Sequence, residues 1–343
     1  MRRFILPTAA CIFLLVAGSC DNSFNPSAPF EPQMVVYSVL TTDSDTQYVR
    51  VYSTYNPPNN DPTSNQDETS VQDAQVSITQ EGGSTFSFQA FTIDRLDKSR
   101  YPTPITAYRA FPFRAERGKT YTLTVSSASL GTVTATTTVP DVGTITPINV
   151  DVLGNPFFTS HDFGLKAGLS AQARGYLARI YVDYLYPPGD GRYQPKRFEV
   201  PLSRAPISCY LDLFKETYPH PTLRSTQANP TVIAGARIFP PEPERIPYSR
   251  ISYMHKIYHL YDREGAGILF RQAVFILVQF DAPLWNYYSV ANLFRDRLSV
   301  RTDEPDYTNF KNGIGMFGSM TVDSLVRPLP EIISHPEIRG GCF

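Results

Sequence analysis

Apolar and polar residues alternate with a period of two in several short tracts between residues 34 and 140 of this 343-residue chain. Met34–Leu40 is an almost continuous apolar run, and Gln47–Tyr52 answers it across a polar connection, which predicts a β-hairpin. The alternation recurs in Ala74–Thr79, Phe86–Gln89, Thr120–Val125 and Val133–Val139. About seven strands in about 105 residues predict an immunoglobulin-like or fibronectin-like β-sandwich over residues 34–140.

A second region with longer strands follows Val139–Gly143, whose proline and glycine mark a domain boundary. Tyr176–Tyr186 alternates and returns as Tyr193–Val200, and a second long strand pair is predicted for Ile251–Leu260 with Ile268–Phe280. Residues 205–250, between these two pairs, are proline-rich and irregular. We therefore expect residues 144–330 to form a larger antiparallel β domain, which makes the protein mainly β.

One short helix is predicted inside this second domain. It begins at Asp281-Ala282-Pro283, where proline stands near the first helical position. The apolar residues that follow at helical spacing are Leu284, Tyr287, Tyr288, Ala291 and Phe294. The pattern is typical of an amphipathic helix packed on a sheet.

The amino-terminal residues have the pattern of an export signal. Arg2 and Arg3 precede an apolar run from Phe4 to Gly18, shorter than the roughly 20 residues that a membrane-spanning helix needs. The run ends in small residues before Cys20, which resembles a bacterial lipoprotein signal. We expect residues 1–19 to be removed and Cys20 to bear lipid; the alternative is a secretory signal cut after Ser19. Residues 20–33 then form a polar tether of up to roughly 40 Å.

Composition and charge narrow the class of protein. The chain has 31 basic and 32 acidic side chains, and the loss of Arg2 and Arg3 with the signal leaves a net charge of about −3. A nucleic-acid-binding protein would need a strongly basic face, so we expect no nucleic-acid partner. The 30 prolines, 22 phenylalanines and 21 tyrosines suit a β protein with many turns.

Two of the four cysteines remain after the signal is removed and Cys20 is lipidated. Cys11 leaves with the signal, so Cys209 and Cys342 are a candidate disulfide in an oxidising compartment. The alternative is two buried free thiols. A disulfide here would tie the tail of residues 331–343 to the proline-rich middle of the second domain.

A long polar segment, Tyr55–Gln72, interrupts the first domain without any periodicity. A loop of this length in a compact domain is either functional or mobile, and its composition favours mobility.

Several weak motifs occur in an order that resembles one family. The sandwich ends in Gly118–Val125 and Ala135–Pro140, and a strand and an Asp-x-Pro sequence later lead into the aromatic helix with Asn286-Tyr287-Tyr288. Asn309–Gly318 follows, in which Asn309, Gly313, Gly315 and Phe317 match an Asn…Gly-x-Gly-x-Phe pattern. Together these features resemble the Bacteroidota lipoproteins of the domain-of-unknown-function family numbered 4249, over residues 20–325. The resemblance implies an outer-membrane lipoprotein, often encoded near a TonB-dependent receptor, and implies no established activity.

Three further segments resemble nucleotide-, phosphate- or metal-binding motifs, but each lacks the surrounding structure or residues that such a site needs. Gly313–Gly318 spells G-x-G-x-x-G, but a strand rather than a helix is predicted to follow, so we expect a turn and no nucleotide cofactor. Gly118-Lys119-Thr120 lacks the first glycine of a phosphate loop, because Phe113 stands there. His255 and His259 would lie about 13 Å apart on a predicted strand, too far to share one metal ion. We expect no catalytic, cofactor or metal site.

The Asn309–Gly318 segment is instead interpreted as architectural. Its glycines permit sharp turns and close backbone approach, with Met316 and Phe317 held between them. We expect Asn309, Gly313, Gly315 and Gly318 to belong to a structural turn motif, and Phe317 to be buried near the helix with Tyr287 and Tyr288.

Two classes of function follow, with a third behind them. The first is an outer-membrane or cell-surface lipoprotein that acts as a non-catalytic binding or structural accessory, with a TonB-dependent receptor as partner. The second is a glycan-binding lipoprotein, which would present coplanar aromatic rings from the second domain. A secreted hydrolase is third, without a recognisable nucleophile motif.

Overall fold

The computed structural model describes residues 30–57, 61, 69–96, 98–99, 103–157, 162–187, 191–208, 213–225, 243–265, 267–293 and 307–334. The export signal, Cys20, Cys209 and Cys342 lie outside the described residues, as do Phe294, most of Tyr55–Gln72 and residues 335–343 of the tail.

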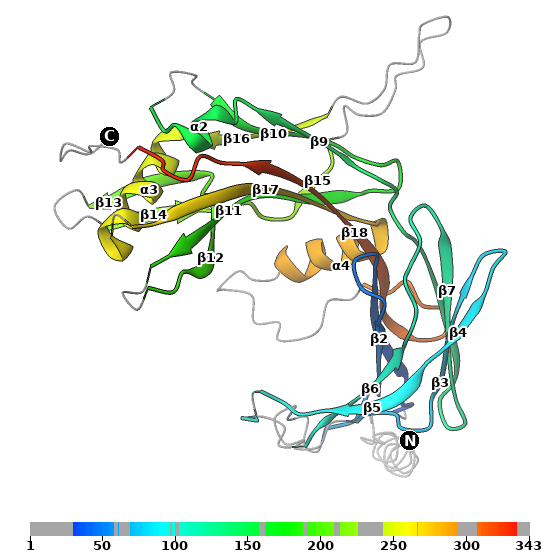
Figure 1. The fold of residues 1–343 in the computed structure, drawn as a ribbon. Coiled ribbons are helices and arrows are strands. Elements are labelled where there is room, and N and C mark those ends of the chain that lie inside the picture. Colours follow the sequence, from blue (N-terminus) through cyan, green and yellow to red (C-terminus); the bar gives the residue numbers. More distant parts are fainter. Residues whose placement is uncertain are drawn as a thin grey trace, which may run out of the picture.

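A bent nine-stranded sheet extends through both halves of the molecule (Figure 1). Its order is β12 (Gln194–Glu199), β11 (Gly175–Tyr186), β17 (Leu269–Phe280), β18 (Ile314–Pro328), β1 (Met34–Thr41), β2 (Gln47–Ser53), β6 (Ile105–Ala110) and β5 (Gln89–Ile93), with β15 (Thr222–Leu223) paired to β11. The predicted hairpins β1–β2 and β11–β12 are both present. Every pair in this sheet is antiparallel except β1 with β18, which are parallel.

The first lobe is a β-sandwich, as the alternation predicts. A second sheet covers one face of β1, β2 and β6, in the order β4 (Thr85–Ser87), β3 (Gln75–Gln80), β7 (Thr120–Ser127) and β8 (Gly131–Thr138). Apolar residues from both sheets form one core, among them Val36, Val49, Ile78, Tyr108 and Leu123. Phe310 and Phe317 also belong to this core although they come from the other end of the chain.

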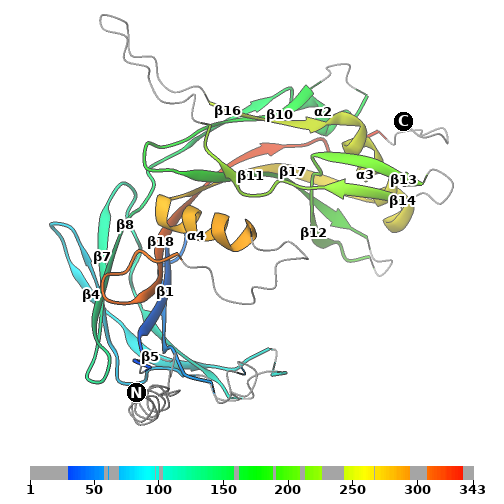
Figure 2. The ribbon, with the colours of Figure 1, turned by 180° about the vertical axis from the view of Figure 1, so that it is seen from behind.

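The second lobe packs smaller elements against the other half of the large sheet (Figure 2). These elements are the sheet β16 (Glu244–Ser249)–β10 (Asp162–Gly168)–β9 (Thr144–Ile148), the hairpin β13 (Ser203–Ser208)–β14 (Leu213–Thr217), the short α2 (Asp151–Gly154) and α3 (Arg250–Glu264). Their shared core includes Phe163, Leu165, Tyr253, Ile257 and Phe275. Ile333 is also buried here, so the lobe continues into the first residues of the predicted tail.

Strand β18 joins the lobes. Its first part, Ile314–Met320, pairs with β1 of the first lobe, and Met320–Pro328 pairs with β17 of the second. The strand therefore changes partner at Met320, and the division at Val139–Gly143 does not separate the lobes completely.

The segment Ile251–Leu260 is helical, so the prediction of a strand there is wrong. Tyr253, Ile257, Leu260 and Tyr261 face the second-lobe core at helical spacing, although the same segment also alternates. The helix is capped at its start, where Ser249 accepts a hydrogen bond from the Ser252 amide, and the chain leaves it at Gly265. β17 consequently pairs with β11 and β18 instead of with this segment.

The predicted helix is present as α4 (Ala282–Leu293), in the inner angle between the lobes (Figures 1 and 2). The Asp281 side chain accepts from the Leu284 amide at 2.9 Å and so caps the first turn. The expectation of a single short helix is corrected, because the described residues also contain α2 and the longer α3.

Candidate functional site

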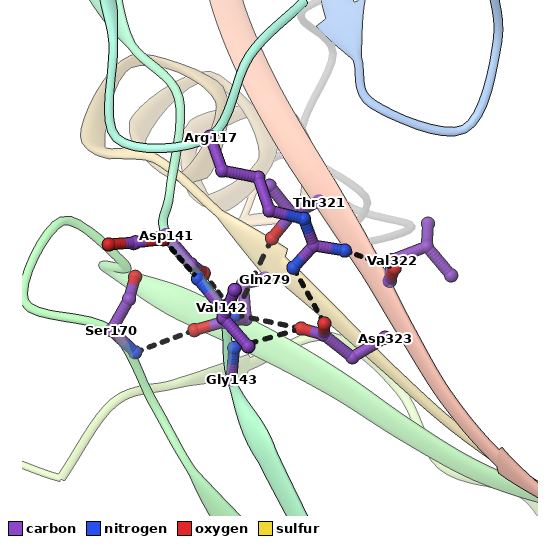
Figure 3. Close-up of polar contacts among 9 residues, drawn as sticks. All are labelled: Arg117, Asp141, Val142, Gly143, Ser170, Gln279, Thr321, Val322 and Asp323. Atoms are coloured by element: carbon purple, nitrogen blue, oxygen red, sulfur yellow. Dashed lines mark hydrogen bonds and ion pairs between the residues drawn. The ribbon is translucent and has the colours of Figure 1, made fainter.

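The strand pair at the centre of the large sheet holds the connection between the lobes (Figure 3). Gln279 of β17 and Asp323 of β18 lie side by side with a 3.2 Å hydrogen bond. The side-chain amide of Gln279 donates to the backbone carbonyl of Asp141 (3.0 Å), and the backbone amide of Gly143 donates to the carboxylate of Asp323 (3.0 Å). Arg117, which lies just before β7 in the first lobe, forms an ion pair with Asp323 at 2.6 Å. Hydrogen bonds to Gln279 and Asp323 therefore hold the connection Asp141–Gly143 against the large sheet, so it is not a free linker between the lobes.

A buried polar cluster lies beside this clamp. Asp281, at the start of α4, is 2% exposed and accepts hydrogen bonds from the hydroxyls of Thr137 on β8 and Ser319 on β18. Burial raises the pKa of Asp281 to about 6, although these donors act in the opposite direction. The cluster joins both lobes and α4 around one carboxyl group.

Asp281 should make the stability of the protein depend on pH. Its pKa is higher in the folded protein than the ordinary 3.8, so its contribution to the free energy of unfolding is largest below pH 4 and is lost as pH rises through about 6. Relative to Asp281→Asn, the parent should lose about 2–3 kcal/mol between pH 4 and 7. Urea unfolding at several pH values measures this. The exposed Asp151→Asn is the control, and equal pH slopes for parent and Asp281→Asn would contradict the prediction.

The sequence-predicted Asn309–Gly318 segment also lies at the junction. The Asn309 side chain donates to the Phe317 carbonyl (2.8 Å) and accepts from the Phe317 amide (2.9 Å). Phe317 is 0% exposed and points into the first-lobe core. Gly318 faces the other side of β18, where an added Cβ would come within 2.9 Å of the Leu284 backbone nitrogen. The helix therefore packs on Gly318, and Phe317 lies on the opposite face of the strand.

The expectation that Gly313, Gly315 and Gly318 shape a turn is corrected, because Gly315 and Gly318 lie inside the long strand β18. Gly313 precedes β18, and the residues after Gly318 continue the same strand, so the G-x-G-x-x-G sequence is not followed by a helix. Its residues are brought together by backbone pairing to β1 and by Asn309.

A cleft of about 740 Å³ lies in the second lobe. We call it the second-lobe cleft. It is lined by Tyr176, Ala178, Leu202, Ser203, Pro219, His220, Thr222, Arg245, Ile246, Pro247, Tyr248, Ser249, Arg250 and Ile251. Its volume lies within the range of about 300–1,000 Å³ that is usual for small-molecule sites.

The walls of the cleft are aromatic and aliphatic. Tyr176 and Ala178 come from β11, and Tyr248 from β16 is 2% exposed, with its hydroxyl donating to the Ala178 carbonyl at 3.3 Å. Burial and the neighbouring Glu244 raise the pKa of Tyr176 to about 12. Burial likewise raises the pKa of Tyr248. Both phenols stay neutral at physiological pH, so the walls remain uncharged.

The rim of the cleft is basic. Arg245 on β16 is exposed, and Arg250 and Ile251 form the first turn of α3. His220 adds an imidazole, and the lining residues that the structure describes include no Asp or Glu. The first turn of α3 also contains no acidic residue. An uncharged interior below a cationic rim is the electrostatic character of this site.

The described residues offer no group of three or more His, Cys, Asp and Glu that could hold a metal ion. His255 and His259 do come closer than the sequence suggested, with ring centroids 6.5 Å apart, because they lie one turn apart on α3. The premise of a 13 Å separation on a strand was wrong.

The sequence interpretation missed the cleft. It treated residues 205–250 as irregular, whereas β16 and the start of α3 supply much of the lining. The signals that could have found these elements are the apolar positions Ile246 and Tyr248 and the cap at Ser249.

Fold and cleft together define a two-lobed β protein with a preformed pocket in its second lobe. The chain belongs to the family described as a domain of unknown function (DUF4249), which matches residues 21–325. A search of the curated proteins finds no match. Among the described residues, no helix combines the length and apolar character needed to cross a bilayer.

Proposed function

We propose that this chain is a lipid-anchored binding protein of the bacterial outer membrane, non-catalytic, with the second-lobe cleft as its ligand site. The observation that carries the proposal is the cleft itself: a volume of about 740 Å³ with apolar walls and a basic rim. The described lining residues include no carboxylate of the kind that a hydrolytic acid–base pair would ordinarily supply.

The packing of the second lobe supports the same proposal. The described lining residues all belong to this lobe, so the cleft is preformed, and a preformed site loses less entropy on binding. A lipid on Cys20 would hold this body close to the membrane, beside an outer-membrane receptor such as the TonB-dependent type that the resemblance implies.

The anchor predicts a large change in location. Cys20→Ser should move the protein from the membrane fraction to the soluble fraction and abolish labelling by a fatty-acid analogue, because two or more acyl chains give stable attachment. Fractionation of whole cells measures this.

Cys11→Ser is the matched control, since that cysteine lies within the signal and should leave with it. A Cys20→Ser protein that remains fully membrane-bound would place the anchor elsewhere in the chain.

Blocking the cleft tests the binding role. Thr222 is exposed at the cleft, so Thr222→Trp should narrow its mouth without disturbing a core. Mature Cys20→Ser protein is exposed to an outer-membrane extract and examined by native mass spectrometry, and a fraction of it should carry a bound ligand as an added mass. Thr222→Trp should lower this ligand-bound fraction at least tenfold. Thr132→Trp, an exposed first-lobe position, should retain it. Equal capture by the two variants would remove the cleft as the site.

A second candidate function, glycan binding, is favoured by aromatic rings of the first lobe, on the side of the large sheet where Tyr37 contacts Tyr287 of α4. Tyr37 and Tyr52 stack at 6.1 Å and 19°, and the 51%-exposed Tyr48 lies 5.8 Å from Phe91. These rings lie on the first lobe, not on the second as the sequence interpretation had it. A captured glycan that is lost in Tyr48→Ala but kept in Thr222→Trp would favour this function over the first.

A further inference from the structure

The charge and the apolar surface of the second-lobe cleft indicate the chemical class of its ligand. Resting on the proposed function, we infer that the cleft takes a small amphiphile with a carboxylate head on an apolar body, with the carboxylate at Arg245 and the body between Tyr176 and Tyr248.

The first argument is the position of Arg245. Its side chain is exposed at the cleft, and within the described part of the chain no carboxylate lies at ion-pair distance from its guanidinium. Some other cations of this lobe do have such partners: Arg179 pairs with Glu199 and Lys256 with Glu216. A guanidinium at the mouth of a cavity matches the two oxygens of a carboxylate.

The second argument is the disposition of the acidic groups. Glu244 is next to Arg245 in sequence but accepts a hydrogen bond from the Ser225 amide (2.6 Å) and interacts with the Tyr176 hydroxyl. It is therefore occupied by the protein, and it does not line the cleft. Arg250 lines the same cleft and adds a second positive charge to its rim.

The third argument is the interior. Ala178, Ile246 and Tyr248 present apolar surface, and the Tyr248 hydroxyl is already bonded to a backbone carbonyl. A fully polar ligand would lose its hydration there without replacement hydrogen bonds, whereas an apolar chain or ring would not. Only the head group then needs polar partners, and Arg245 supplies them.

Decanoate and decanamide, which have the same chain and differ in charge, are the probes. Calorimetric titration of the mature Cys20→Ser protein should give at least tenfold tighter binding of decanoate, the scale of one charge-assisted contact. Arg245→Gln should remove the preference and leave decanamide binding unchanged. Lys119→Gln, an exposed first-lobe cation, should keep the preference and is the matched control for net charge.

The outcomes separate this inference from the proposed function. Equal binding of the two probes, or a preference that survives Arg245→Gln, overturns the carboxylate assignment while cleft binding stands. If neither probe binds but Thr222→Trp still abolishes capture of the extract-derived mass, the ligand class alone is wrong. If neither probe binds and Thr222→Trp captures as much as the parent, the proposed function falls with it.

Discussion

Phe317→Ala should lower the free energy of unfolding by roughly 3–5 kcal/mol, the usual effect of truncating a fully buried phenylalanine. The ring is 0% exposed in the first-lobe core, and its backbone is held at both its amide and its carbonyl by Asn309. Those hydrogen bonds keep the strand from moving inward, so the cavity left by the ring should not collapse. A decrease in melting temperature of roughly 10 °C is expected by calorimetry.

Phe157→Ala is the control for this change, because Phe157 is 44% exposed and should alter stability little. Thermal stability and ligand capture, measured on Phe317→Ala, distinguish an architectural role of this segment from a ligand site. Normal thermal stability together with lost ligand capture would make Asn309–Gly318 a binding segment and contradict the interpretation given above.

Gly315→Ala should have an even larger effect, with little folded, soluble protein recovered. Gly315 has φ of 123°, and a Cβ there would lie 1.9 Å from the Val36 carbonyl oxygen, which is backbone and cannot rotate away. Because Gly315 pairs with Val36 in the parallel β1–β18 ladder, the substitution must separate the two strands. We expect a loss above about 4 kcal/mol, measured by urea unfolding of whatever protein remains soluble.

Gly82→Ala separates the two causes of this effect. Gly82 also has positive φ (67°), but an added Cβ there meets nothing within 4 Å. It should therefore show only the backbone strain of about 1–2 kcal/mol. A Gly315→Ala protein no less stable than Gly82→Ala would mean that β1 and β18 adapt, and that their close approach is not required.

Phe317→Ala and Gly315→Ala both act on β18, the strand that the two lobes share. Since β18 pairs with β1 up to Met320 and with β17 from there on, weakening its first part removes one wall of the first-lobe core. The second-lobe cleft lies on the other half of the sheet. Ligand capture at low temperature should consequently be less sensitive to Phe317→Ala than to Thr222→Trp.

Local sequence alone determined the elements whose signals are local. The β1–β2 and β11–β12 hairpins follow from alternation over adjacent tracts, and α4 follows from an aspartate cap, an early proline and helical spacing. The family resemblance was also readable from short motifs in order, and the match over residues 21–325 confirms it. The hairpins and the helix depend on residues that are close together in the sequence, so backbone geometry and propensity suffice for them.

Tertiary structure decided the rest. Ile251–Leu260 fits both a strand and a helix by pattern, and the helix is selected because it presents Tyr253 and Ile257 together to the second-lobe core. The parallel pairing of Val36 with Gly315 joins residues from opposite ends of the chain, and no local pattern specifies such a partner. The cleft arises in the same way, because β11, β15 and β16 meet only after the sheets have packed. Its basic rim is a property of that packing, since Arg245 and His220 acquire a common role only when the fold places them at one opening.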